Sequence, residues 1–181
     1  MGKKFENLIL YICQKSAGDH YFGRTKLNKL LYFADFGHFR EHGHPISGEK
    51  YMALQNGPVP RHMIGTLDQM KRAGTLREDE VNVGANRPML RPAAIQNPDI
   101  SQFSSSEISY VDEVLAKYAR MTGTELANLS HAEPGYRAAR DKETIEYGTS
   151  YLPPYVTITP ALVRRTNELA KRYGWNDDAR C

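Results

Sequence analysis

Apolar residues recur at helical spacing near the start of the chain and predict an amphipathic helix. Phe5, Leu8, Ile9 and Ile12 fit the i, i+3, i+4, i+7 pattern that places side chains on one face of a helix. We therefore expect this helix to run from about Phe5 to Ser16.

A second helix is predicted between Thr25, which can cap its start, and Gly43, which can end it. Apolar side chains lie on most of its sides, and a helix of that kind is normally buried in the core. We expect this helix to be the centre of the domain. Its apolar residues are Leu27, Leu30, Leu31, Tyr32, Phe33, Ala34, Phe36 and Phe39.

Three segments predict β-structure or turns. Tyr51 to Leu54 is rich enough in β-forming residues for a short strand. Asn56 to Pro60 predicts a compact turn, because Gly57 supplies backbone freedom and two prolines fix φ. Thr75 to Val83 and Pro88 to Pro92 predict the two arms of a hairpin, with the proline-containing arm at an edge.

Further helical patterns make the protein mainly α. Together the patterns predict one compact, mainly α (α+β) domain over residues 1–181, with a small antiparallel β element. The remaining expected helices are one through Met63, Leu67 and Met70, one after a serine cap through Ile108, Val111, Leu115 and Tyr118, a short one capped by Thr124, another short one opened by Pro134, and a C-terminal one at about 160–174.

Composition, charge and cysteine count limit the classes of protein to which this chain can belong. With 40% hydrophobic and 25% charged residues, the chain is apolar enough to fold, and its net charge of +3 neither favours nor excludes a nucleic-acid partner. Its two cysteines, Cys13 and Cys181, do not form a disulfide framework. No apolar run approaches the length needed to span a bilayer, so we expect a soluble cytoplasmic protein with no membrane partner.

His38 and His42 raise the question of a metal site, because residues four apart share one helical face. The pattern lacks the acidic partner of a zinc-protease motif, and His38 lies in line with core positions. We interpret both histidines as structural and expect no metal and no cofactor. A metal-dependent hydrolase remains the alternative that these histidines leave open.

An acid–base centre of Asp35, His38 and His131 is a second candidate chemistry. Nucleophilic catalysis would also need an activated serine or cysteine. Ser130 adjoins His131, but neighbouring residues on a helix point in different directions, and Cys13 lies on an apolar stripe. We therefore expect no catalytic residues and no enzyme activity.

A DNA-binding interpretation rests on the segment from Thr124 to Arg140, which can form a helix–turn–helix. Acidic residues follow it at Asp141 and Glu143, and a phosphate backbone would repel them. A DNA-binding autorepressor therefore remains a weaker alternative.

Tyr147, Tyr151 and Tyr155 surround two prolines outside any clear helical stripe. Tyrosine and proline on irregular backbone suit a protein interface. A loop packed over its own domain explains the same pattern, and both interpretations stay open.

Two blocks of residues resemble the signature of the Panacea, or SocA-like, antitoxin domain family. Because the two blocks occur in the right order, the match is specific and covers about residues 27–140. The first block is Lys29 to Asp35, His38, Gly43, Pro45-Ile46, Gly48, Tyr51, Ala53 and Gly57 to Pro60; the second is Leu126, Leu129 to His131, Glu133-Pro134, Arg137 and Ala139-Arg140.

The resemblance implies a mainly helical antitoxin that neutralises a cognate toxin, encoded nearby in a bacterial or phage genome, by direct binding. The family supplies no catalytic residues. We expect Tyr51, Gly57, Pro58, Val59 and Pro60 to contribute to partner binding, because prolines lower the ordering cost of an interface loop. Asp35, His38 and His131 are expected to be structural, with the two histidines hydrogen-bonded between helices.

Overall fold

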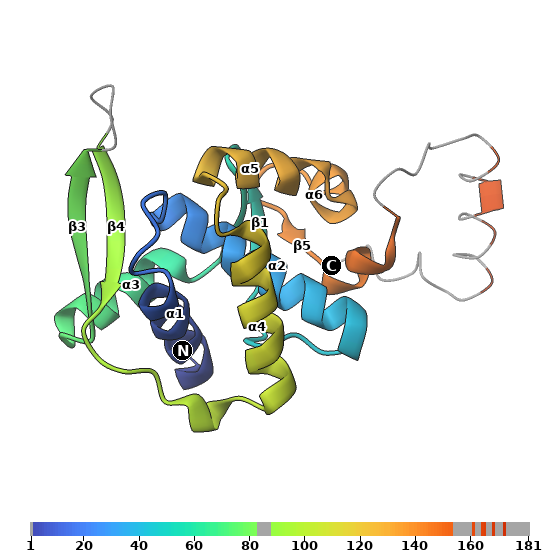
Figure 1. The fold of residues 1–181 in the computed structure, drawn as a ribbon. Helices are drawn as coiled ribbons and strands as arrows, with labels where there is room; N and C mark the ends of the chain where they lie inside the picture. Colours follow the sequence, from blue (N-terminus) through green and yellow to red (C-terminus); the bar gives the residue numbers. More distant parts are fainter. Residues whose placement is uncertain are drawn as a thin grey trace.

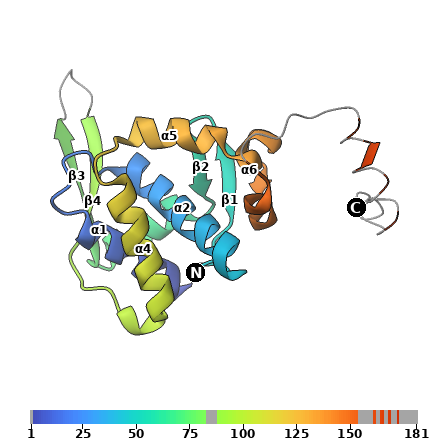
Figure 2. The ribbon, with the colours of Figure 1, turned by 45° about the vertical axis from the view of Figure 1, so that its right-hand side comes forward.

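The computed structural model describes residues 2–82 and 88–153, together with residues 161, 164, 165, 168 and 172 (Figure 1). Helix α2 (Arg24–His42) runs through the middle of this part of the chain. Helices α1 (Lys3–Lys15), α4 (Ser105–Tyr118) and α5 (Gly123–Ala132) pack against it, and α5 lies across one end of α4 and α2 (Figure 2). The predicted mainly α fold with a small antiparallel β element is confirmed.

The central position of α2 follows from its side chains. Leu27, Leu30 and Leu31 are at most 1% exposed, and Tyr32 and Phe36 on other sides of the helix are also buried. Since the helix is apolar around most of its circumference, only a site enclosed by other elements removes all of these side chains from water. The prediction of a core helix is confirmed.

A three-stranded antiparallel sheet has the order β2-β1-β5. Its strands are β1 (Tyr51–Leu54), β2 (Gly57–Pro60) and β5 (Thr144–Ile145). The prediction of β1 is confirmed, but the prediction of a turn over Asn56 to Pro60 is wrong, because this segment is mostly strand β2. Its prolines are tolerated since β2 pairs on one side only, with β1, and proline cannot donate to a second neighbour.

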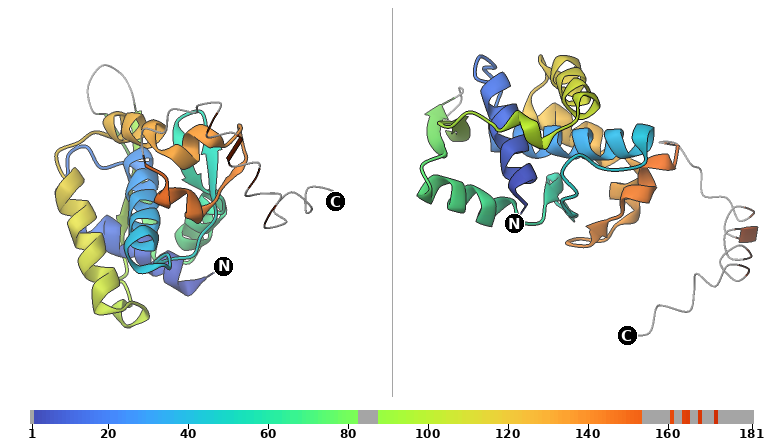
Figure 3. Two further views of the ribbon diagram at one scale, coloured as in Figure 1. Left: turned by 90° about the vertical axis from the view of Figure 1, so that its right-hand side faces the viewer. Right: turned by 90° about the horizontal axis from the view of Figure 1, so that it is seen from below.

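The predicted hairpin is confirmed and forms a second, separate sheet. Strands β3 (Leu76–Asn82) and β4 (Pro88–Ala94) pair from Leu76 with Ala94 to Asn82 with Pro88. The hairpin follows α3 (Met63–Arg72), which the apolar spacing also predicted. It lies toward one end of the molecule, and α6 (Pro134–Ala138) and the short 3₁₀ helix η2 (Tyr147–Tyr151) lie toward the other (Figures 1 and 3).

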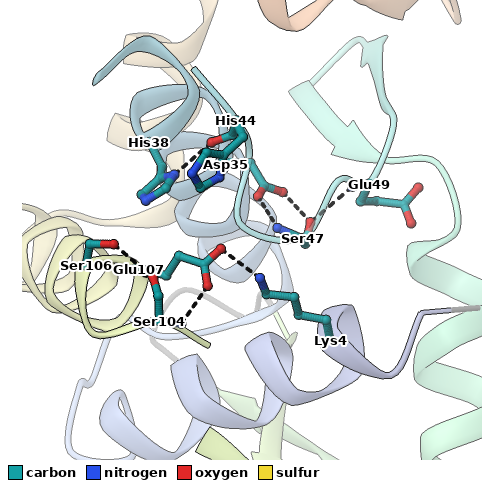
Figure 4. A network of polar contacts seen from close by, with 9 residues as sticks. All are labelled: Lys4, Asp35, His38, His44, Ser47, Glu49, Ser104, Ser106 and Glu107. Atoms are coloured by element: carbon teal, nitrogen blue, oxygen red, sulfur yellow. Dashed lines mark hydrogen bonds and ion pairs between the residues drawn. The ribbon is translucent and has the colours of Figure 1, made fainter. Parts of the chain in front are cut away.

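Side-chain caps fix where α4 and α5 begin. The Ser104 hydroxyl accepts from the backbone N–H of Glu107, and the Glu107 carboxylate accepts from the Ser104 N–H and from Lys4 of α1 (Figure 4). Helix α5 is capped by Thr122, not by Thr124 as predicted, because Glu125 stands three residues after Thr122 and completes a capping box.

A short 3₁₀ helix, η1 (Ile100–Gln102), precedes α4. The predicted C-terminal helix at about 160–174 lies outside the described residues apart from single positions. Within the described part, no helix is both long enough and apolar enough to cross a membrane.

Candidate partner-binding site

Asp35 is the centre of a buried hydrogen-bond network that holds the segment after α2. Its carboxylate accepts from the backbone N–H and the hydroxyl of Ser47 and from the Tyr51 hydroxyl at 2.7 Å (Figure 4 shows the Ser47 bonds). Burial raises the pKa of Asp35, and these hydrogen bonds oppose the rise. The predicted structural role of Asp35 fits this geometry, since every partner belongs to the fold.

His38 is fully buried on α2 and donates from Nδ1 to the carbonyl of His44, 2.7 Å away (Figure 4). Its Nε2 is buried without a partner among the described residues. The expected hydrogen bond between helices is therefore wrong in detail, because the acceptor lies in the loop that follows the same helix. Asp35 and His38 do not bond to each other, so they do not form the acid–base pair considered from sequence.

The histidine cluster lacks the arrangement of a metal site. The His38 ring lies 4.3 Å from the His42 ring and 4.8 Å from the His44 ring, centroid to centroid. Across the described residues, no three His, Cys, Asp or Glu side chains are placed so that they could hold a metal ion. The rings pack on one another and on Tyr110.

Lys29 is a buried lysine that the sequence interpretation missed. It is 1% exposed, and its ammonium donates to the carbonyl of Pro58 at 2.9 Å. Burial lowers the pKa of Lys29 to about 8. The available signal was a lysine inside a helix that is apolar on most sides. This bond ties β2 to α2.

Gly57 permits that close packing. Its φ of +91° lies in the left-handed region, and a Cβ there would lie 2.5 Å from the Ser130 hydroxyl and 2.9 Å from the Lys29 ammonium. Residues from both signature blocks, on α2, β2 and α5, therefore meet at one internal point.

A second buried lysine, Lys26, closes the end of α4. Its ammonium donates to the carbonyls of Ala119 and Met121 and pairs with Asp19 at 2.6 Å. Carbonyls at a helix end are otherwise unsatisfied, and a cation there is favourable.

The corner between α5 and α6 excludes the helix–turn–helix interpretation. Helix α6 has five residues, and only Glu133 separates it from α5, so it is too short to serve as a recognition helix. The Tyr136 hydroxyl binds the carbonyl of Leu54 and holds α6 against the sheet. His131 stacks on Tyr136 at 4.6 Å, and its Nε2 is buried without a hydrogen bond in the described part, contrary to the expected bond between helices.

The tyrosines after β5 were interpreted either as a protein interface or as a loop packed over its own domain, and the two that are described differ in this respect. Tyr147 packs on Phe36 at 4.5 Å, and its hydroxyl binds the carbonyl of Glu49, so it covers its own domain. Tyr151 is 58% exposed, and Tyr155 lies outside the described residues.

The five residues expected to bind a partner lie together on β1 and β2, but mostly on the inside. Tyr51 is 0% exposed, and Gly57, Pro58 and Pro60 are buried. A buried side chain offers a partner no surface, so direct contact by these four is a correction to the sequence interpretation. Val59 is the one of the five with a partly exposed side chain.

The family comparison agrees with the two signature blocks. Residues 27–136 match the family described as antitoxin SocA-like, Panacea domain. The match spans more than half of the chain, from the first turn of α2 into α6, and the protein belongs to this family. No curated protein and no solved structure matches the chain.

Proposed function

We propose that this protein is an antitoxin that holds a cognate toxin inactive by direct binding, without chemistry of its own. The observation that carries the proposal is membership of the SocA-like antitoxin family over residues 27–136. The partner is accordingly a toxin protein, and the expected ratio in the complex is fixed.

The position of the signature residues supports a scaffold role. Lys29, Asp35, His38 and Ser130 are at most 1% exposed, and their hydrogen bonds run to groups of the same chain. A catalytic group must touch its substrate, whereas Lys29 ties α2 to β2, Asp35 and His38 hold the segment after α2, and the Ser130 hydroxyl bonds within α5. Such a rigid frame lowers the ordering cost of binding and suits a protein that acts by contact.

Of the five residues expected to bind the partner, Val59 remains available for contact, because its side chain is partly exposed. We assign Tyr51, Gly57, Pro58 and Pro60 the task of holding β2 in place, and Val59 the task of contact. Exchange of Val59 for aspartate is expected to weaken binding of the toxin by about tenfold or more, because a carboxylate would lose its hydration in an interface. Exchange for threonine, which has a similar shape, is the matched control, and equal binding by all three proteins would contradict this assignment.

Co-expression with the product of the adjacent gene tests the proposed function. We expect that growth is rescued and that the two proteins co-purify in a fixed ratio. A neighbour that is not toxic, or a toxic neighbour whose effect is neither relieved nor accompanied by a complex, would contradict the proposal.

A further inference from the structure

A small pocket of about 220 Å³ lies between α2, α4 and the start of α6. Its volume suits one amino-acid side chain better than a larger ligand. Its wall on α2 includes Phe33 and Phe36, its wall on α4 includes Tyr110 and Tyr118, and Glu133 and Ser150 line it from the α5–α6 corner and from η2.

The pocket is built by close packing of its walls. At Gly37, in the middle of α2, a Cβ would lie 2.0 Å from the Tyr110 hydroxyl, so the missing side chain lets Tyr110 lie against the helix. Glycine inside a helix costs about 1 kcal/mol relative to alanine. The close approach of Tyr110 explains why glycine nevertheless occupies position 37. Phe33 and Tyr118 pack against each other at 4.9 Å between ring centroids.

Glu133 and Ser150 bring unsatisfied polar groups to this aromatic pocket. The Glu133 side chain is half-buried and forms neither a hydrogen bond nor an ion pair with any residue in the described ranges. Burial raises the pKa of Glu133, while the charges of Arg40 and Lys117 oppose the rise without closing an ion pair. The Ser150 hydroxyl oxygen is buried with no hydrogen-bond partner in the same part of the chain.

The charges at the rim balance one another. Glu41 and Glu113 line the pocket together with Arg40 and Lys117, two carboxylates against two cations. Glu133 adds a third carboxylate to these two cations, neither of which forms an ion pair with it, and it shares the pocket with aromatic rings whose faces attract cations. The pocket lining therefore has one carboxylate more than it has positively charged hydrogen-bond donors.

We propose that this pocket receives an arginine side chain of the protein partner. The guanidinium donates hydrogen bonds to the Glu133 carboxylate, and its plane stacks on the aromatic wall. Arginine fits better than lysine, because its planar group has five donors, stacks on rings and loses less hydration on burial. That the partner is a toxin rests on the proposed function; the preference for a guanidinium does not.

The wider depression near the hairpin supports no comparable statement. It has a volume of about 570 Å³ and is lined by apolar side chains such as Met89 and Leu90 together with the N-terminal ends of α2 and α5. Its lining does not specify what covers it, whereas the Glu133 pocket specifies charge, donors and size.

Titration of the full chain with N-acetyl-arginine amide, followed by amide NMR shifts, tests the pocket without the toxin. We expect saturable shifts at Gly37, Tyr110 and Ser150 with a millimolar dissociation constant, and none with N-acetyl-citrulline amide, which has the same shape but no charge. Glu133→Gln is expected to weaken binding about tenfold or more. Glu80→Gln, at an exposed position of β3, removes the same charge elsewhere and should leave binding unchanged.

Each outcome of this titration decides the matter. Absence of shifts in these residues up to about 50 mM, equal binding of the citrulline amide, or equal loss in both glutamine variants overturns the proposal. An unchanged spectrum outside the pocket in Glu133→Gln shows that the fold is retained.

The same two variants separate this proposal from the proposed function. If wild type and Glu80→Gln bind the toxin and Glu133→Gln binds it about tenfold or more weakly, the arginine belongs to the toxin. If all three bind the toxin equally, the pocket proposal fails and the antitoxin function stands. If arginine amide binds but wild type does not neutralise the toxic neighbour, the proposed function fails.

Discussion

At the scale of single residues, the protein uses buried polar groups to hold its centre together. Asp35 and Lys29 are both enclosed on α2, yet their partners differ in kind: Asp35 accepts three hydrogen bonds, whereas Lys29 has one carbonyl. A buried charge with few partners is costly, and that cost appears as a pKa shift.

Lys29 should make stability depend on pH in the alkaline range. Its pKa is about 8 in the folded protein, against the ordinary value of 10.5. Between these values the unfolded chain binds more protons than the folded one, so stability rises with pH through this window. The free energy of unfolding of wild type, relative to Lys29→Met, is expected to increase by roughly 2–3 kcal/mol from pH 8 to pH 10.5.

Urea unfolding at several pH values measures this difference. Lys50→Met, which changes an exposed lysine, is the control and should show no such trend relative to wild type. A constant difference between wild type and Lys29→Met across the window would show that Lys29 is not held in a desolvated site.

Tyr51 should matter for stability and not for contact. Tyr51→Phe removes the hydroxyl that donates to Asp35 and is expected to lower the free energy of unfolding by about 1–3 kcal/mol, since it leaves a buried carboxylate short of a donor. Toxin binding by the folded variant should be unchanged. Tyr21→Phe, at a position 46% exposed, is the matched control and should cost little. Weaker toxin binding at unchanged stability in Tyr51→Phe would refute the structural assignment.

At the scale of elements, Gly57 joins β2 to α2 and α5, and its exchange should be costly for two reasons. Alanine there meets the left-handed φ of +91° and a contact of 2.5 Å with the Ser130 hydroxyl. Gly43 has a similar φ of +79° but open space around its Cα. We expect Gly43→Ala to cost about 1 kcal/mol in thermal or urea unfolding and Gly57→Ala clearly more. Equal costs would mean that the contact at Gly57 relaxes freely.

The elements that the sequence predicted are those whose causes are local. The spacing of apolar residues predicted α1, α2, α3 and α4, and strand β1 followed from residue type. Strand β2 was missed because its prolines resemble turn residues, and its place depends on pairing with β1 and on the contact with Lys29. Strand β5 joins β1 from about ninety residues away, and no local pattern indicates such a pairing.

In the candidate site, too, features with local causes could be predicted from the sequence and features that depend on long-range contacts could not. The signature residues could be found in the sequence, but the burial of Tyr51, Gly57, Pro58 and Pro60 could not, since it depends on how the small sheet packs against α2. The pocket at Glu133 could not be found either, because its walls come from α2, α4, the α5–α6 corner and η2.

At the scale of the whole molecule, the family region packs around α2, and α1 completes its core. Helix α1 precedes the matched region, yet Leu8, Ile9 and Ile12 are 0% exposed in the common core. The partly exposed Val59, to which we assign partner contact, lies on this support, and a preorganised support lowers the ordering cost of the proposed binding.

The most direct test of this account is a titration of the purified toxin's activity with increasing amounts of this protein. If neutralisation is binding, residual toxin activity falls in proportion to the added protein and reaches zero at a fixed ratio, and the recovered toxin has unchanged mass. Inactivation of many toxin molecules by one molecule of this protein, or a toxin of altered mass, would contradict the account and identify an enzyme instead.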